Sequence, residues 1–257
     1  MNSPALAPVC PAHVSVKNLS KTFKDRKRGE VKAVSDVSFE AQSGEIFGLL
    51  GVNGAGKTTA MRMLATMLYP SAGDAELCGH SIRKAPEQVR RNIGFMSTAT
   101  SLYGRLTARE MVRYFGQLNG MDKKKIDTRI DELFTLFDMH DFADARCDKL
   151  STGMKQKVSI VRTVLHDPPV MIFDEPTAGL DVLTSRTIID FVRDCRDQGK
   201  CVLFSTHIMQ EVEKLCDRVG VIHDGRLLAC EDTATLKARS ASGSVEDAFV
   251  AMVEEAS

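Results

Sequence analysis

Residues 51–58 form the segment of this chain with the clearest chemical meaning. They read GVNGAGKT, the spacing G-x-x-x-x-G-K-T of a loop that cradles phosphate groups. Glycine at 51, 54 and 56 allows successive backbone N–H groups to converge on an anion, where a Cβ would obstruct the curl. Lys57 places an ammonium near the β and γ phosphates, and the Thr58 hydroxyl can ligate magnesium. The segment therefore predicts a nucleoside triphosphate site.

The residues on either side of this loop fit the same prediction. Residues 45–50, EIFGLL, form an apolar run typical of a buried strand, and a helical pattern opens at Thr59. A helix that begins at the loop directs the partly positive end of its dipole toward the phosphates. The order strand, glycine-rich loop and helix predicts the α/β core of a P-loop NTPase.

A second segment places two carboxylates at the end of a strand. Residues 170–173, VMIF, are apolar and are followed directly by Asp174 and Glu175. In open α/β sheets, ligands bind at the carboxyl ends of the strands. Asp174 is therefore predicted to hold magnesium, and Glu175 to orient or deprotonate the attacking water. A strand end with two solvated acids is the alternative.

A third segment, LSTGMKQK at 150–157, precedes a helical pattern over 158–165. Ser151 is predicted to cap this helix, and a helix start with serine and glycine can bind an anion. An ordinary capped helix is the alternative. With these segments in order, followed by Ala178–Asp181 and Phe204–His207, the chain resembles the nucleotide-binding subunit of an ABC transporter over nearly its whole length.

The resemblance implies a role for each matching residue, with ATP and Mg²⁺ as cofactors. Glu175 would be the catalytic base, His207 the γ-phosphate sensor, and Lys57 a third catalytic residue. Thr58 and Asp174 would bind the metal. The positions implied to contact nucleotide are Phe23, Gly51, Asn53, Gly54, Ala55, Gly56, Lys57, Thr58, Thr59, Ser151 and Gly153. For Phe23 a place in the core is an equal alternative, and for His207 a place beside a helix start without a ligand.

The resemblance also implies that the site is shared. In this family two subunits enclose two ATP molecules head to tail, so Ser151 and Gly153 of one subunit would meet the γ-phosphate held by Lys57 of the other. Asp181 would lie at that interface. Because the chain has one phosphate loop, the second subunit is predicted to be another copy or a paralogue.

Two positions depart from the family pattern. Thr98 stands where the family usually has a glutamine that touches magnesium and water, and its hydroxyl is shorter and has no amide carbonyl. Met154 stands where the signature commonly has glutamine. The sequences of residues 94–97 and 102–107 and this signature are together similar to the corresponding segments of ATPase subunits from bacterial sodium-efflux ABC exporters.

Composition narrows the function classes. The 257 residues are 43% hydrophobic, and 34 basic residues balance 34 acidic ones, so the chain lacks the positive charge typical of nucleic-acid binders. Seven cysteines without CxxC spacing argue against a disulfide framework or zinc site and indicate reduced thiols in cytosol. No apolar run reaches the ~20 residues needed to cross a bilayer.

The remaining periodicities predict the organisation of the chain. Residues 14–18 and 31–41 alternate as strands around a charged turn at 24–30, which predicts an antiparallel β subdomain. Residues 98–166 show helical spacing and a capping box at Thr107 and Glu110, which predicts a helical subdomain. A hairpin around Asp224 and a terminal helix over 245–253 follow. We expect an ATP-binding domain at 12–235 and a short helical extension at 236–257.

These features predict the ATP-hydrolysing subunit of an ABC exporter, with sodium as the favoured cargo. It would act through a separate membrane permease, at the cytoplasmic face of the inner membrane. In the family the permease docks between the helical subdomain and the core, so residues after Met96 are candidates for that contact. The alternatives are a soluble ABC ATPase without a permease and an exporter of another substrate. A P-loop GTPase or small-molecule kinase would not explain residues 150–154, and the chain lacks the N-K-x-D guanine motif.

The departure at Thr98 gives a first prediction. Because its short side chain would have to reach the site across a loop, we expect Thr98→Ala to leave the ATPase rate of the isolated subunit largely intact. Only the stimulation of that rate by the membrane partner should change. The measurement is the ATPase rate of the parent protein and of Thr98→Ala, each as the isolated subunit and in the complex with the membrane partner. A tenfold loss in the isolated subunit, about 1.4 kcal/mol in the barrier, would instead place Thr98 among the catalytic residues.

Overall fold

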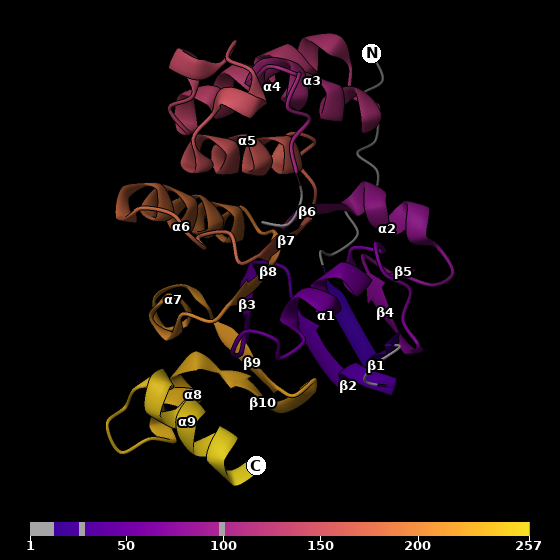
Figure 1. Ribbon diagram of the computed structural model, residues 1–257, viewed down its shortest axis with the longest axis vertical. Coiled ribbons are helices and arrows are strands. Elements are labelled where there is room, and N and C mark those ends of the chain that lie inside the picture. Colours follow the sequence, from indigo (N-terminus) through magenta and orange to yellow (C-terminus); the bar gives the residue numbers. More distant parts are fainter. Residues whose placement is uncertain (1–12, 26–28, 98–100, 257) are drawn as a thin grey trace, which may run out of the picture.

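A computed structural model describes residues 13–25, 29–97 and 101–256 of the chain. Two sheets lie side by side below a layer of helices (Figure 1). The six-stranded sheet has the order β10-β9-β3-β8-β7-β6, and the four-stranded sheet the order β2-β1-β4-β5. This is the α/β P-loop core with an antiparallel sheet and a helical unit that the sequence predicts.

The larger sheet brings the segments of the predicted site together at the carboxyl ends of its strands. Its strands are β3 (Glu45–Leu50), β6 (Ile93–Ser97), β7 (Val170–Asp174), β8 (Cys201–Thr206), β9 (Arg218–His223) and β10 (Arg226–Asp232). The parallel register sets Asp174 opposite both Ser97 and Ser205, and Leu50 opposite Thr206. The phosphate loop, the two carboxylates and the segment before His207 therefore leave the sheet at neighbouring points.

Both faces of this sheet are covered, which explains its continuous apolar runs. In β3, Ile46 and Leu50 pack into one hydrophobic cluster with the helical unit, whereas Phe47 and Leu49 pack into another with the antiparallel sheet. Phe39 stacks on Phe47 across the second interface, with ring centroids 4.6 Å apart. The alternation fixes the register, because a shift of one residue would exchange the two faces.

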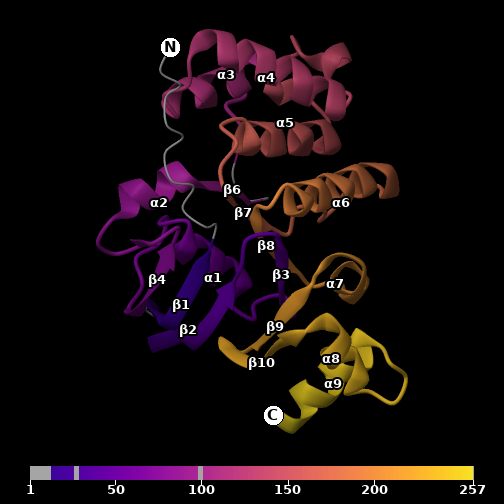
Figure 2. The ribbon, with the colours of Figure 1, turned by 180° about the vertical axis from the view of Figure 1, so that it is seen from behind.

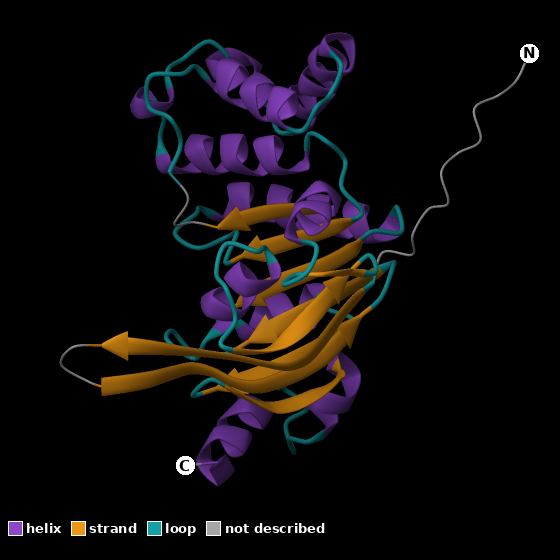
Figure 3. Cartoon of the chain, turned by 90° about the vertical axis from the view of Figure 1, so that its right-hand side faces the viewer, coloured by secondary structure: helices purple, strands orange, loops and turns teal. Residues whose placement is uncertain are grey.

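The antiparallel sheet differs from the sequence prediction at its outer end. Its strands are β1 (Val14–Asp25), β2 (Gly29–Ala41), β4 (Ala72–Leu77) and β5 (His80–Ser81). The sequence predicted a charged turn over 24–30. The residues at both ends of this segment belong instead to the strands, and Lys24 is paired with Glu30. This hairpin projects from the body as a two-stranded arm (Figure 3), so charged side chains can remain in water there.

Helices cover the sheets on both sides (Figure 2). Next to the sheets lie α1 (Lys57–Leu64), α2 (Pro86–Asn92), α6 (Val182–Asp197) and α7 (Met209–Leu215). The helical unit contains α3 (Ala108–Leu118), α4 (Lys123–Leu136) and α5 (Thr152–Val164), with 3₁₀ turns at His140–Phe142 and Cys147–Lys149. The predicted capping box is present, because Thr107 and Glu110 exchange hydrogen bonds at the start of α3.

The last part of the chain packs on the main core. The predicted hairpin is β9 and β10, and it is followed by α8 (Thr233–Ala238), which the sequence did not indicate, and by α9 (Val245–Ala256). Phe249 and Met252 of α9 belong to the same hydrophobic cluster as the helical unit. The division into a domain at 12–235 and an extension at 236–257 stays a prediction.

Most of the cysteines in the described part of the chain are buried thiols. Cys147, Cys195, Cys201 and Cys216 are buried, and Cys230 is half-buried. Desolvation raises the pKa of Cys195 to about 12, and burial also raises the pKa values of Cys201 and Cys216. In the same described ranges, no helix is long and apolar enough to cross a membrane.

Candidate functional site

The phosphate loop joins β3 to α1 and is held close to the hairpin of β9 and β10. Gly56 has a φ of +110°, and a Cβ there would lie 2.4 Å from the Ala33 carbonyl oxygen. At Gly51 a Cβ would lie 2.3 Å from the Ile222 carbonyl oxygen. Because neither backbone oxygen can move far, both positions require glycine. These close approaches hold the loop tightly against β2 and β9.

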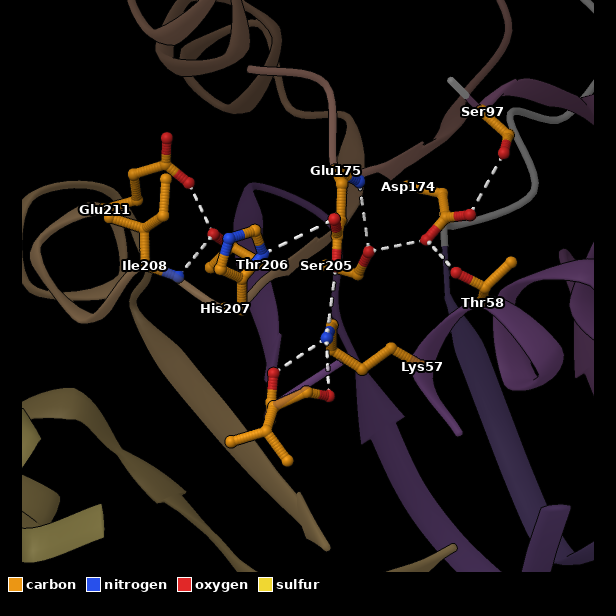
Figure 4. Close-up of polar contacts among 12 residues, drawn as sticks. Lys57, Thr58, Ser97, Asp174, Glu175, Ser205, Thr206, His207, Ile208 and Glu211 are labelled. Atoms are coloured by element: carbon orange, nitrogen blue, oxygen red, sulfur yellow. Dashed lines mark hydrogen bonds and ion pairs between the residues drawn. The ribbon is translucent and has the colours of Figure 1, made fainter. Parts of the chain in front are cut away.

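Lys57 is the first residue of α1 and is almost fully buried, at 3% exposure. Its ammonium donates to the carbonyl oxygens of Gly51, at 2.7 Å, and Val52, at 3.1 Å. It also lies 3.1 Å from Glu175 Oε1 (Figure 4). A buried ammonium needs such partners, and these three oxygens supply them.

Asp174 lies at the centre of the site, where three hydroxyl groups donate to its carboxylate. Thr58 and Ser205 bond Oδ1, at 3.0 and 2.8 Å, and Ser97 bonds Oδ2 at 3.0 Å. The sequence prediction included Thr58 but missed Ser97 and Ser205. The signal for both was a polar residue near the end of an apolar strand, which parallel pairing sets beside Asp174.

Glu175 directly follows the strand in an unusual backbone conformation. Its φ is +50°, a left-handed conformation that costs of the order of 1–3 kcal/mol for a residue with a Cβ. Its backbone N–H points at Ser205, with both the carbonyl oxygen and Oγ of that residue 3.1 Å away. This conformation directs the carboxylate between Lys57 and His207.

His207 follows β8 and completes the row of ionisable side chains. Its Nδ1 lies 3.4 Å from Glu175 Oε2, a separation suited to an electrostatic contact rather than a well-formed hydrogen bond. The imidazole is 38% exposed, so it can still reach a ligand. The structure therefore places all three predicted catalytic side chains, Lys57, Glu175 and His207, in one continuous arrangement.

A cavity of about 220 Å³ opens between the loop and the strand ends. Its lining contains both carboxylates and most of the predicted nucleotide contacts. The lining residues are Ala33, Asn53, Gly54, Gly56, Lys57, Thr58, Thr59, Asp174 and Glu175. Gly51 and Ala55 lie in the loop but do not line the cavity, and Ala33, from β2, was not predicted. The cavity has the polar, cation-containing surface that a triphosphate requires.

The signature segment lies elsewhere on the chain. Ser151 caps α5 and accepts a hydrogen bond from the Met154 N–H, as predicted, yet neither it nor Gly153 lines the cavity. Gly153 faces Thr184 near the start of α6, where a Cβ would lie 3.7 Å from its hydroxyl. Ser151 is exposed. A single chain thus keeps the signature apart from its own phosphate loop.

The start of α6 is exposed beside this signature. Asp181 caps the helix through the N–H groups of Leu183 and Thr184, and the hydrogen bonds from Thr184 lower the pKa of its carboxyl. The next two residues, Val182 and Leu183, are 81% and 78% exposed. Two adjacent apolar side chains in water are typical of a surface that another protein covers.

Two further predicted positions have different outcomes. Phe23 is 41% exposed, with the Lys21 ammonium 5.2 Å from its ring centroid, so the alternative that it belongs to the core is wrong. It does not line the phosphate cavity, and stacking on adenine stays a prediction. Thr98 lies outside the described residues.

Sequence comparisons identify proteins that are related to this chain. The family model for ABC transporters matches residues 34–178. The chain is 43% identical over 216 residues to the ABC transporter ATP-binding protein NatA of Bacillus subtilis, covering 84% of this chain and 87% of that protein. It is 36% identical over 222 residues to the Nod factor export ATP-binding protein I of Burkholderia lata, covering 86% and 71%.

Solved structures agree with this relationship. An ATP-binding subunit of an ABC transporter superposes with a TM-score of 0.83 at 29% identity, over 93% of this chain and 99% of the other. A dimeric ATP-binding cassette in a post-hydrolysis state with ADP and phosphate superposes with a TM-score of 0.78 at 25% identity, over 85% and 98%. The chain belongs to the ABC transporter family, as one of its ATP-hydrolysing, ATP-binding subunits.

Proposed function

We propose that this protein works as a dimer in which each ATP lies between the phosphate loop of one subunit and the signature of the other. The observation that supports this is the separation within one chain: the cavity contains Lys57, Asp174 and Glu175, while Ser151 and Gly153 are outside it. Exposed Val182 and Leu183 beside the signature supply apolar surface for such an interface. The partner would be a second copy or a paralogous subunit.

The residues of the cavity and His207, which contacts Glu175 from outside the lining, divide the work of hydrolysis. The loop N–H groups and Lys57 bind the phosphates and stabilise charge that develops on the γ-phosphoryl group. Glu175 orients the attacking water and accepts its proton, and His207, 3.4 Å from Glu175, contacts the γ-phosphate side. Burial of Lys57 and Asp174 at 3% and 2% exposure strengthens these electrostatic interactions.

The donor set beside the phosphate loop also fits Mg²⁺. Thr58 Oγ1 and Asp174 Oδ1 are 3.0 Å apart, and hydroxyl, carboxylate and phosphate oxygens are the ligands this ion prefers. We assign Thr58 and Asp174 to hold it, directly or through water. When bound, the metal would neutralise charge on the β and γ phosphates.

We place the contact with the membrane subunit on the face where the helical unit meets α2. A groove of about 1640 Å³ lies there, between Arg90 and Arg91 of α2 and the turn from α3 to α4. Leu118 lines this groove and is 62% exposed. One turn earlier on α3, Tyr114 is 39% exposed, and its ring meets that of Tyr103, which is 57% exposed, edge to face at 5.9 Å. Exposed aromatic and aliphatic side chains at a groove suit a docking helix.

Export is the favoured direction of transport, and sodium the favoured cargo. A relative named for Nod factor export supports export as a class. The sodium assignment is supported by the sequence of 94–97 and 102–107 and by the Ser-Thr-Gly-Met signature. Export of another substrate and a soluble ATPase without a permease remain the alternatives. The site of action would be the cytoplasmic face of the inner membrane.

The first test of this mechanism concerns Glu175. Glu175→Gln keeps the shape of the side chain but removes the proton acceptor, so we expect ATP binding to persist while turnover falls at least a hundredfold. The measurement is steady-state ATPase rate together with nucleotide affinity, and Glu254→Gln, on the exposed face of α9, is the control. Near-parent turnover in Glu175→Gln would show that another group is the base.

The second test concerns the shared site. Ser151→Arg introduces a bulky cation at the exposed start of α5, so we expect nucleotide binding to the monomer to stay within a few fold while ATP-driven dimerisation is lost. Light scattering of the Glu175→Gln background with ATP measures the dimer, and Ser242→Arg in the exposed turn before α9 is the control. ATP-dependent dimers of Ser151→Arg would contradict the head-to-tail arrangement.

The third test concerns cargo and partner. The chain is purified with its membrane subunit and reconstituted in vesicles, and ATP and radioactive sodium or potassium are added outside, on the side of the outward-facing ATPase subunits. We expect ATP-dependent sodium flux and a sodium-stimulated ATPase, both absent with Glu175→Gln. Flux of neither ion with an active ATPase would favour another cargo. An ATPase rate that no membrane protein stimulates would favour the soluble alternative.

A further inference from the structure

A buried carboxylate outside the cavity connects the two segments that present Glu175 and His207. Glu211 lies in the first turn of α7 and is 7% exposed. Its Oε1 accepts a hydrogen bond of 2.6 Å from the Thr177 hydroxyl, and its Oε2 accepts one of 2.5 Å from the Thr206 hydroxyl. Hydroxyl donors at such short distances from a carboxylate are among the stronger hydrogen bonds in proteins.

The two threonines that donate these hydrogen bonds lie next to the residues proposed to act in hydrolysis. Thr177 lies two residues after Glu175, and Thr206 lies directly before His207. Thr206 Oγ1 also accepts a hydrogen bond of 2.9 Å from the Ile208 N–H, so the hydroxyl fixes the backbone on both sides of His207 (Figure 4). One side chain thus holds the turn after β7 and the turn after β8 at a set separation.

These two turns need external support. Glu175 has a left-handed backbone conformation, which persists only where neighbouring groups impose it. From the other side, Gln156 of α5 donates to the Pro176 carbonyl at 2.6 Å. The segment Glu175–Thr177 is therefore held between α5 and α7, and Glu211 supplies the hold from α7.

We propose that Glu211 is a positioning residue for hydrolysis, which sets the distance between Glu175 and His207 through Thr177 and Thr206. It does not line the cavity, so we expect it to act through these neighbours. Val212 and Leu215 of the same helix are buried in the apolar core, and a carboxylate there is costly unless hydrogen bonds satisfy it. The inference rests on the proposed roles of Glu175 and His207.

The test compares turnover with binding. Glu211→Gln replaces one acceptor oxygen with an amide donor that faces a hydroxyl donor, so we expect kcat to fall about tenfold while nucleotide affinity stays within twofold. Thr177→Val should lower kcat in the same way, and Thr177→Ser, which keeps the hydroxyl, should lose much less. Glu211 and Thr177 belong to one hydrogen-bond network. The loss of kcat in the double variant Glu211→Gln, Thr177→Val should therefore be smaller than the product of the two single losses.

The control is Glu213→Gln, two residues along α7, where the side chain is exposed and accepts a hydrogen bond from the Val245 N–H. Its kcat should match the parent. Parent kcat in Glu211→Gln, an equal loss in Glu213→Gln, or multiplicative effects with Thr177→Val would each overturn the proposal. If Glu211→Gln does not fold, the contrast between Thr177→Val and Thr177→Ser still decides. Parent turnover in Glu175→Gln would instead show that the assigned base is wrong, which separates that failure from this one.

Discussion

The Asp174 carboxylate is the point on which the rest of the site depends. It is 2% exposed, and an anion so far from water is stable only where donors surround it. The three donors come from α1, β6 and β8, which are far apart in the sequence. They meet because parallel pairing aligns the ends of β6, β7 and β8, and because α1 starts directly behind the phosphate loop. The same pairing determines where Glu175 and His207 emerge.

The second constraint is that the phosphate loop and the signature lie on different elements of the chain. The phosphate loop and the strand ends belong to the sheet, whereas Ser151 and Gly153 begin a helix of the helical unit. Gln156, one turn further along that helix, bonds the Pro176 carbonyl next to Glu175. In the proposed dimer, a displacement of α5 by a partner's nucleotide would therefore act on the backbone beside Glu175. This contact would give a physical route between the two proposed sites.

Local sequence predicted the elements with strong signals and missed those fixed by tertiary contacts. The apolar runs before Gly51 and Asp174 predicted β3 and β7, and Thr107 and Ser151 predicted the starts of α3 and α5, because each signal is contained within a few residues. The pairing of Lys24 with Glu30 could not be predicted, since hairpin hydrogen bonds override a charged composition. Ser97, Ser205 and Glu211 were missed because their importance comes from contacts with residues of other elements. Thr177 and Thr206, the donors to Glu211, are separated by 29 positions of sequence.

The buried thiols give the molecule a set of internal reporters. A thiol reagent reacts with the thiolate, and burial both covers Cys195, Cys201 and Cys216 and raises their pKa values. Modification therefore has to wait until the surrounding structure opens. Because these residues lie in α6, in β8 and after α7, and Cys147 lies in the helical unit, their separate modification rates would measure the free energy of local opening in four places. The native cysteines would be enough to follow which part of the subunit opens first, and no cysteine would have to be introduced by mutation.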